Sequence, residues 1–159
     1  MNSNSANPAA PLTILDTNVL LDAFLFEGDP NLQPLRAAVR NGDLRVITTP
    51  WAANEFRMIL RLDKVPGPQD RKDIAWDLFT EFVTVMDLPE KTQPVPKCAD
   101  RDDQEFIDLA VATAARWLLS RDKKVLKLRR RFNKLELPTH IIHPLDWCAL
   151  ISSQSDTTA

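Results

Sequence analysis

Short apolar runs alternate with longer amphipathic segments along most of this chain, and this alternation limits the folds open to it. Four runs rich in apolar and β-branched residues predict strands at 12–15, 44–49, 117–120 and 139–143. Apolar residues at helical spacing predict helices at 18–26, 30–39, 50–62, 70–85, 102–116, 122–128 and 144–151. Strands that alternate with helices in this way favour an α/β fold, in which helices cover both faces of a parallel sheet.

The length of 159 residues and the hydrophobic content of 44% fit one globular domain. We expect that domain to span 12–150, with a disordered N-terminal tail at 1–11 and a flexible C-terminal tail at 151–159. The sequence shows neither a secretory signal nor a membrane-spanning run. Its two cysteines have no metal-ligand spacing, so we expect reduced thiols, a cytoplasmic location and no contact with a membrane.

Carboxylates recur where the predicted strands end or the following helices begin. Asp16 ends the first strand, Glu55 follows the second, and Asp122 follows the "WLLS" strand. Asp100, Asp102 and Asp103 introduce the helix predicted at 102–116, after a proline-rich loop. Because crossover helices bring the carboxyl ends of parallel strands to one edge of the sheet, these acids are expected to converge there.

Each acid also has a purely structural explanation. Asp16 and Asp122 are favoured helix caps, and Asp102 with Glu105 matches a capping box. Glu55 fits a solvated helix surface equally well. Taken together, however, ionised carboxylates that converge would repel one another unless a cation joins them. Mg²⁺ and Mn²⁺ prefer such oxygen ligands, so the joint placement of the acids favours a site for one of these ions.

Positive charge is concentrated in one segment, although the net charge of the whole chain is −2. Residues 116–134 carry a charge of +8, and the rest of the chain carries −10. This asymmetry favours a surface that faces a polyanion, and a metal site beside it suits phosphodiester hydrolysis. A solvated helix face is the alternative explanation for the basic segment.

Other catalytic chemistries find little support in the sequence. His140 and His143 lie on one predicted strand with their side chains on opposite faces, so they do not form a shared metal site. Cys98 has no evident histidine partner. Phosphate-binding and nucleophile-elbow motifs are absent from the sequence, which contains three glycines.

Four stretches together carry a family resemblance: "ILDTNVLLDAF", "NEFRMIL", "DRDDQEFIDLAVATAARWLLSRDKKVLKL" and "THIIHPLDWCAL". They resemble PIN domains, and most of all the bacterial toxin type, including the VapC-like proteins. The likeness covers about 12–150. It implies a three-layer α/β/α sandwich around a mainly parallel sheet, Mg²⁺- or Mn²⁺-dependent endoribonuclease activity, and the role of the toxin in a toxin–antitoxin pair.

The resemblance also implies the site residues. The catalytic acids are Asp16, Glu55, Asp103 and Asp122, of which Asp16, Asp103 and Asp122 hold the metal. Thr17 or Asn18 orients Asp16, and Ser120 matches a hydroxyl residue that the family often keeps. Relatives often have a further acid where this chain has Lys124, which favours one bound ion, with Asp100 as partial compensation.

The expected partners are an RNA substrate, a small antitoxin protein and a second copy of the chain. The residues assigned to RNA contact all lie in the basic segment: Arg121, Lys123, Lys124, Lys127, Arg129, Arg130 and Arg131. The same segment is also suited to docking acidic residues of an antitoxin. Two alternative functions stay open from the sequence, namely a catalytically weak or inactive RNA- or protein-binding module and a housekeeping RNA-processing nuclease.

Overall fold

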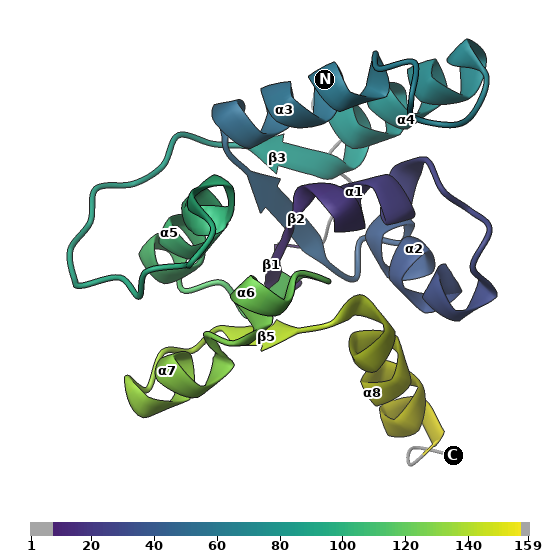
Figure 1. Cartoon of the computed structure of the whole chain (residues 1–159). Coiled ribbons are helices and arrows are strands. Elements are labelled where there is room, and N and C mark those ends of the chain that lie inside the picture. Colours follow the sequence, from purple (N-terminus) through teal and green to yellow (C-terminus); the bar gives the residue numbers. More distant parts are fainter. Residues whose placement is uncertain (1–7, 157–159) are drawn as a thin grey trace.

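The computed structural model describes residues 8–156 as a three-layer α/β/α domain (Figure 1). The strands are β1 (Leu12–Leu15), β2 (Arg45–Thr48), β3 (Val83–Val85), β4 (Trp117–Leu119) and β5 (His140–Ile142). The helices are α1 (Thr17–Phe24), α2 (Gln33–Arg40), α3 (Pro50–Leu60), α4 (Gln69–Phe82), α5 (Gln104–Thr113), α6 (Lys123–Leu126), α7 (Arg129–Lys134) and α8 (Pro144–Asp156). Two 3₁₀ turns, η1 (Pro30–Leu32) and η2 (Arg101–Asp103), lead into α2 and α5.

The sheet has five strands in the order β3-β2-β1-β4-β5, and every neighbouring pair is parallel. The chain therefore builds the sheet outward from β1 in one direction, returns to the centre, and builds outward again from β4. Ile14 on β1 is in register with Ile47 on β2 and with Leu118 on β4. The predicted parallel α/β fold is confirmed, and the boundary between β1 and β4 is the point where the strand order reverses.

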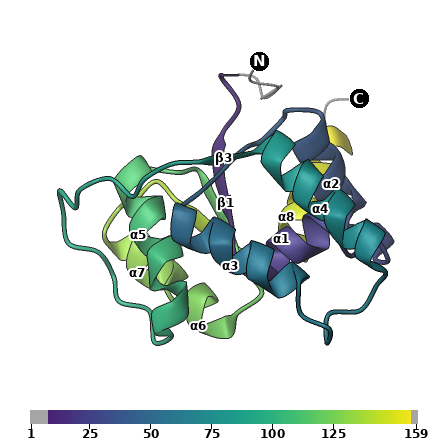
Figure 2. The same cartoon turned by 90° about the horizontal axis from the view of Figure 1, so that it is seen from above.

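Alternate strand residues face two separate hydrophobic cores, as the pleat of a strand requires. Leu15, Val46 and Leu119 pack in the core shared with α1, α2, α3, α4 and α8. Ile14, Ile47 and Leu118 pack in the core shared with α5, α6 and α7. Figure 2 shows β1 between these two groups of helices. The central strands are apolar on both faces because both faces are covered.

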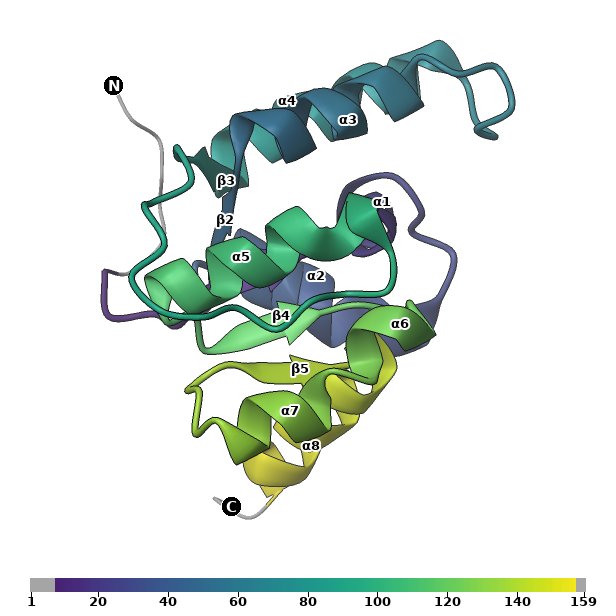
Figure 3. The same cartoon turned by 60° about the vertical axis from the view of Figure 1, so that its left-hand side comes forward.

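The prediction of one helix over 70–85 is wrong at its end. Helix α4 stops at Phe82 and the chain continues directly into β3, a strand of three residues at the edge of the sheet. Thr84 and Val85 are exposed there, so no buried apolar pattern marks the strand in the sequence. Figure 3 shows α3 and α4 beside β3 at this edge, and α7 and α8 beside β5 at the other.

Several predicted boundaries also shift. The helix expected at 30–39 begins with the turn η1, and the basic segment forms two helices, α6 and α7. At the C-terminus α8 continues to Asp156, beyond the expected helix end. At the N-terminus Arg45 Nε donates to the carbonyl of the buried Ala10, so the chain is packed against the domain before Leu12. The rest of the two predicted tails, 1–7 and 157–159, lies outside the described residues. No helix in the described part of the chain is long and apolar enough to cross a membrane.

Candidate metal centre

The predicted acids gather at the point where the strand order reverses. Asp16 follows β1, and Ser120 and Asp122 follow β4, its parallel neighbour. In open α/β sheets the crevice beyond the carboxyl ends of two such strands is the usual ligand site. Asp100 and Asp103 lie in the segment that leads into α5. Helix α5 packs on the face of the sheet that carries Ile14 of β1 and Leu118 of β4.

Asp16 is the buried support of this site. Its side chain is 3% exposed, caps α1 by accepting from Val19 N at 3.0 Å, and accepts a hydrogen bond from Ser120 Oγ. Burial raises the pKa of Asp16, and the hydrogen bonds from Ser120 and Val19 oppose that rise. Thr17 Oγ1 has no hydrogen-bond partner among the described residues, so its hydroxyl does not hold the Asp16 carboxylate. An orienting role of the exposed Asn18 stays a prediction.

Ser120 joins Asp16 to the rest of the site. The buried Ser120 hydroxyl donates to Asp16 and accepts the backbone N–H of Asp122 at 3.0 Å. Asp122 in turn caps α6 by accepting from Lys124 N at 2.8 Å. The predicted cap roles of Asp16 and Asp122 are therefore both present, and in each case one carboxylate oxygen is engaged in capping.

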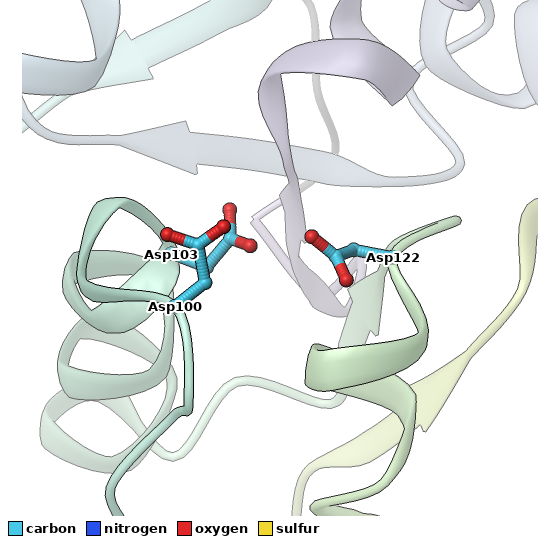
Figure 4. A group of neighbouring side chains, drawn as sticks. All are labelled: Asp100, Asp103 and Asp122. Carbon is cyan, nitrogen blue, oxygen red and sulfur yellow. The ribbon is translucent and has the colours of Figure 1, made fainter.

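Three carboxylates form the cluster at the centre of the site: Asp100, Asp103 and Asp122 each offer an oxygen, and these oxygens lie within 4.8 Å of one another. Figure 4 shows Asp100 and Asp103 on one side, facing Asp122 on the other. Asp100 was expected to play a supporting part and instead belongs to this cluster. Asp16, expected as a ligand, is not one of these three residues, so its direct contact with a metal stays a prediction.

The expected capping box is wrong. Asp100 caps the turn η2 by accepting from Asp102 N at 3.0 Å, and Asp103 at the start of α5 makes no side-chain cap bond. Glu105 accepts a hydrogen bond at 2.8 Å from the hydroxyl of Thr49, which caps α3. Asp103 is consequently free to point its carboxylate at Asp122.

The electrostatics of Asp103 and Asp122 show that the cluster is short of positive charge. Burial, a side-chain hydrogen bond with Asp122 and the negative charges of Asp122, Asp16 and Asp100 raise the pKa of Asp103 to about 7. The backbone N–H of Lys124 and the hydrogen bond with Asp103 lower the pKa of Asp122. The two acids thus share a proton that a divalent cation would displace.

Glu55 reaches the site from α3. Its Oε2 atom is buried and has no hydrogen-bond partner among the described residues. Burial is the main cause of the raised pKa of Glu55, followed by the charges of Asp102, Glu105, Asp100 and Asp16. The solvated helix surface considered from the sequence therefore does not describe Glu55, whose Oε2 is buried and whose pKa is affected by the charges of the other acids.

The sequence analysis did not identify the residues that hold the loop before Asp100. Gln104 on α5 accepts from Cys98 N at 2.6 Å and donates to the carbonyl of Pro96 at 3.1 Å and to Asp108 at 3.0 Å. Lys91 in the same loop pairs with Asp108 at 3.4 Å. A polar residue on the otherwise apolar face of α5 was the one available sign, since the sequence places Asp108 among buried neighbours.

The residues predicted to contact RNA are all exposed on and before α6 and α7. Two have fixed positions: Arg121 Nε lies 3.4 Å from Asp22 Oδ2, and Arg129 Nε donates to the carbonyl of Ile141 at 2.8 Å. In residues 8–156 no ion pair involves Lys123, Lys124, Lys127, Arg130 or Arg131. The segment thus presents uncompensated positive charge beside Asp122.

The residues present fit a hard divalent cation. The cluster offers oxygen donors alone, and these donors approach closely enough to share one ion. The raised pKa of Asp103 reflects the charge that such an ion would neutralise. Within the described residues, the arrangement is suited to holding Mg²⁺ or Mn²⁺ next to a bound polyanion.

Comparison with known proteins gives one family and one related fold. The sequence profile of the PIN domain matches residues 13–124, a range that includes Asp16, Glu55 and the whole Asp100–Asp103–Asp122 cluster. No curated protein sequence matches significantly. A solved structure of VapBC2 from Rickettsia felis, bound to a DNA fragment from its promoter, superposes with a TM-score of 0.54 at 14% identity. The alignment covers 83% of this chain and 98% of the other, which establishes a shared fold.

Proposed function

Because this chain belongs to the PIN-domain family, we propose that it is an Mg²⁺- or Mn²⁺-dependent endoribonuclease. The observation that carries the proposal is the cluster of Asp100, Asp103 and Asp122, whose oxygens lie within 4.8 Å of one another at the reversal point of the sheet. RNA is the proposed substrate because exposed lysines and arginines follow Asp122 directly.

The proposed mechanism assigns a separate task to each group. Asp100, Asp103 and Asp122 would hold the cation, which when bound neutralises phosphate charge and activates water. Asp16, fixed by Ser120 and Val19, supplies buried negative charge behind the cluster. Glu55 Oε2 has no hydrogen-bond partner in the described structure and would accept the proton of the water that attacks phosphorus. The phosphorus–oxygen bond to the leaving ribose would break, and that oxygen would take a proton from solvent. The basic segment holds the RNA backbone.

The proposed biological role is that of a toxin in a toxin–antitoxin pair, with a small antitoxin protein as its partner in the cytoplasm. The resemblance of the sequence to toxin-type PIN domains supports this role, and so does the fold shared with VapBC2 from Rickettsia felis. A homodimer is proposed on the same resemblance. Expression of the chain in bacteria should arrest growth, whereas the Asp122→Asn variant should not.

Cleavage of purified RNA is the direct test. We expect cleavage by the purified protein in Mn²⁺ or Mg²⁺ and none in chelator. Loss of an outer-shell partner typically costs 10–100-fold, so Asp103→Asn is expected to lower the rate by at least about 100-fold. Asp63→Asn removes the same charge from an exposed turn outside the cluster and is the matched control. Cleavage that persists in chelator, or that Asp103→Asn leaves unchanged, would contradict the proposal.

One observation favours the alternative of a non-catalytic RNA-binding module. Lys124 stands where relatives often have another acid, and in the structure it contributes its backbone N–H to Asp122 while its side chain is exposed. Retained RNA affinity with no Mn²⁺ binding at millimolar metal, measured by calorimetry, would favour that alternative.

A further inference from the structure

Asp22 is a buried acid that the proposed chemistry does not use. It lies on α1, is 5% exposed, and its Oδ2 atom has no hydrogen-bond partner among the described residues. Its carboxylate forms an ion pair with Arg121, whose Nε lies 3.4 Å from Oδ2. Burial raises the pKa of Asp22 and the charge of Arg121 lowers it, so an ionised carboxylate at this depth is stabilised by that arginine.

The other arginine near Asp22 is already committed to the backbone. Arg36 is buried and donates to the carbonyls of Asp22, Phe26 and Asp29, the last at 2.6 Å. It therefore holds the turn after α1 rather than the Asp22 carboxylate. Arg121 is the cation in direct contact with that carboxylate in the described structure.

Arg121 occupies a specific place in the site. In the sequence it stands between Ser120, which donates to Asp16, and Asp122, which belongs to the carboxylate cluster. Its charge also acts on Asp16, whose pKa it lowers. The pair with Asp22 engages Nε, and 45% of the Arg121 side chain stays exposed. Because a guanidinium has five N–H donors and the contact with Asp22 is made by Nε, further donors of Arg121 are suited to a phosphate.

We propose that Asp22 is a positioning residue that holds Arg121 as the phosphate-contacting arginine of the site. This inference rests on the proposed nuclease function and deepens it. It gives Arg121 a defined position beside Asp22, whereas the exposed lysines of α6 form no ion pair among the described residues. An arginine held in place loses less conformational freedom when it binds RNA, so it contributes more than its charge alone.

The sign of the Asp22→Asn effect separates positioning from simple electrostatics. Removing a negative charge makes the protein more positive, so net charge predicts tighter RNA binding. Release of Arg121 predicts weaker binding instead. RNA affinity is measured by fluorescence anisotropy in chelator, where no cleavage occurs. We expect Asp22→Asn and Arg121→Gln each to weaken RNA binding about tenfold, one bidentate phosphate contact being worth about 1.4 kcal/mol or more.

Lys127→Gln is the matched control, since it removes one positive charge from the same exposed segment and should weaken binding only about twofold to threefold. The double variant Asp22→Asn/Arg121→Gln should bind no more weakly than Arg121→Gln alone, because the two residues act as one unit. Arg121→Lys keeps the charge and is expected to restore binding only in part.

Three results would overturn the inference: an Arg121→Gln effect no larger than that of Lys127→Gln, tighter binding by Asp22→Asn, or additive effects in the double variant. The comparison of Arg121→Gln with Lys127→Gln decides even if Asp22→Asn does not fold. Absence of cleavage with every metal would refute the proposed nuclease while these binding differences persisted. Cleavage with equal effects of Arg121→Gln and Lys127→Gln would refute this inference alone.

Discussion

Replacement of Asp103 by asparagine is expected to stabilise the metal-free protein above neutral pH while abolishing its stabilisation by metal. In the folded protein the oxygens of Asp103 and Asp122 lie within 4.8 Å of each other. At 4.8 Å, the upper limit of that separation, two charges repel by about 3.5 kcal/mol at an effective dielectric constant of about 20 and by about 0.9 kcal/mol in water. The cluster is half-buried, so we expect a gain in the free energy of unfolding of about 1–2 kcal/mol.

The gain should depend on pH in a defined direction. The pKa of Asp103 is raised from 3.8 to about 7 on folding. Between these values the folded state binds more protons than the unfolded state, so the wild-type protein loses stability as the pH rises through the folded pKa. Asparagine does not titrate, and its N–H group can donate to Asp122 at any pH, as the protonated Asp103 does below its pKa. The advantage of Asp103→Asn is therefore full above pH 7 and vanishes near pH 4.

Thermal unfolding in chelator at pH 8 measures the effect, and a gain of about 1–2 kcal/mol corresponds to about 3–6 °C in Tm. Mn²⁺ should reverse the order, since a ligand at one hundred times its Kd stabilises the wild type by about 2.7 kcal/mol. Asp63→Asn, in an exposed turn, should change neither value. A variant less stable than wild type in chelator at pH 8, or equally stabilised by Mn²⁺, would refute the reasoning.

Three further outcomes are expected. The affinity for Mn²⁺ should fall by about tenfold per pH unit below pH 7, because the ion displaces the proton shared by Asp103 and Asp122. Calorimetry between pH 5 and 8 measures this affinity, and an affinity that does not change with pH would contradict the prediction. Ser120→Ala should lower the free energy of unfolding, measured by urea denaturation, by about 1.5–3 kcal/mol, because the buried Asp16 carboxylate loses its hydroxyl donor. A cost near zero would show that the hydrogen bond from Val19 N alone stabilises this carboxylate. Ala114→Gly should raise the free energy of unfolding by about 0.5–1 kcal/mol in the same measurement, because Ala114 ends α5 in the left-handed region at φ 53°. A loss of stability would show that packing of the Ala114 methyl group stabilises the fold.

The strands that were predicted correctly are those whose burial leaves a mark in the sequence. β1, β2, β4 and β5 pack against helices and therefore carry apolar or β-branched residues. β3 is three residues long, lies at the edge of the sheet and has two exposed residues. Its sequence pattern therefore predicts a continuation of α4. Its existence is decided by pairing with β2, a contact between segments far apart in the chain.

The sequence predicts where the candidate site lies, but it does not predict which carboxylates come close to one another there. The position of an acid after a strand depends on local sequence, and the alternation of strands and helices sends such acids to one edge. Which oxygens come close depends on the loop at 87–99, held by Gln104 and Asp108, and no periodic pattern encodes that path. Asp100 therefore enters the cluster, although the family pattern pointed to Asp16 in its place.

The strand order explains why Asp16 and Ser120 act together although 104 residues separate them. β1 and β4 are neighbours because the chain leaves the centre of the sheet after β1 and returns to it at β4. In open parallel sheets the carboxyl ends of two strands at such a reversal point are where ligands usually bind, and Asp16, Ser120 and Asp122 follow β1 and β4 at this place. Asp16 caps α1 with Oδ1 and accepts the Ser120 hydroxyl with Oδ2, and Asp122 caps α6 with Oδ1 while it belongs to the carboxylate cluster. The choice between a helix cap and a functional carboxylate is thus not exclusive here, because Asp122 caps α6 and also offers an oxygen to the carboxylate cluster.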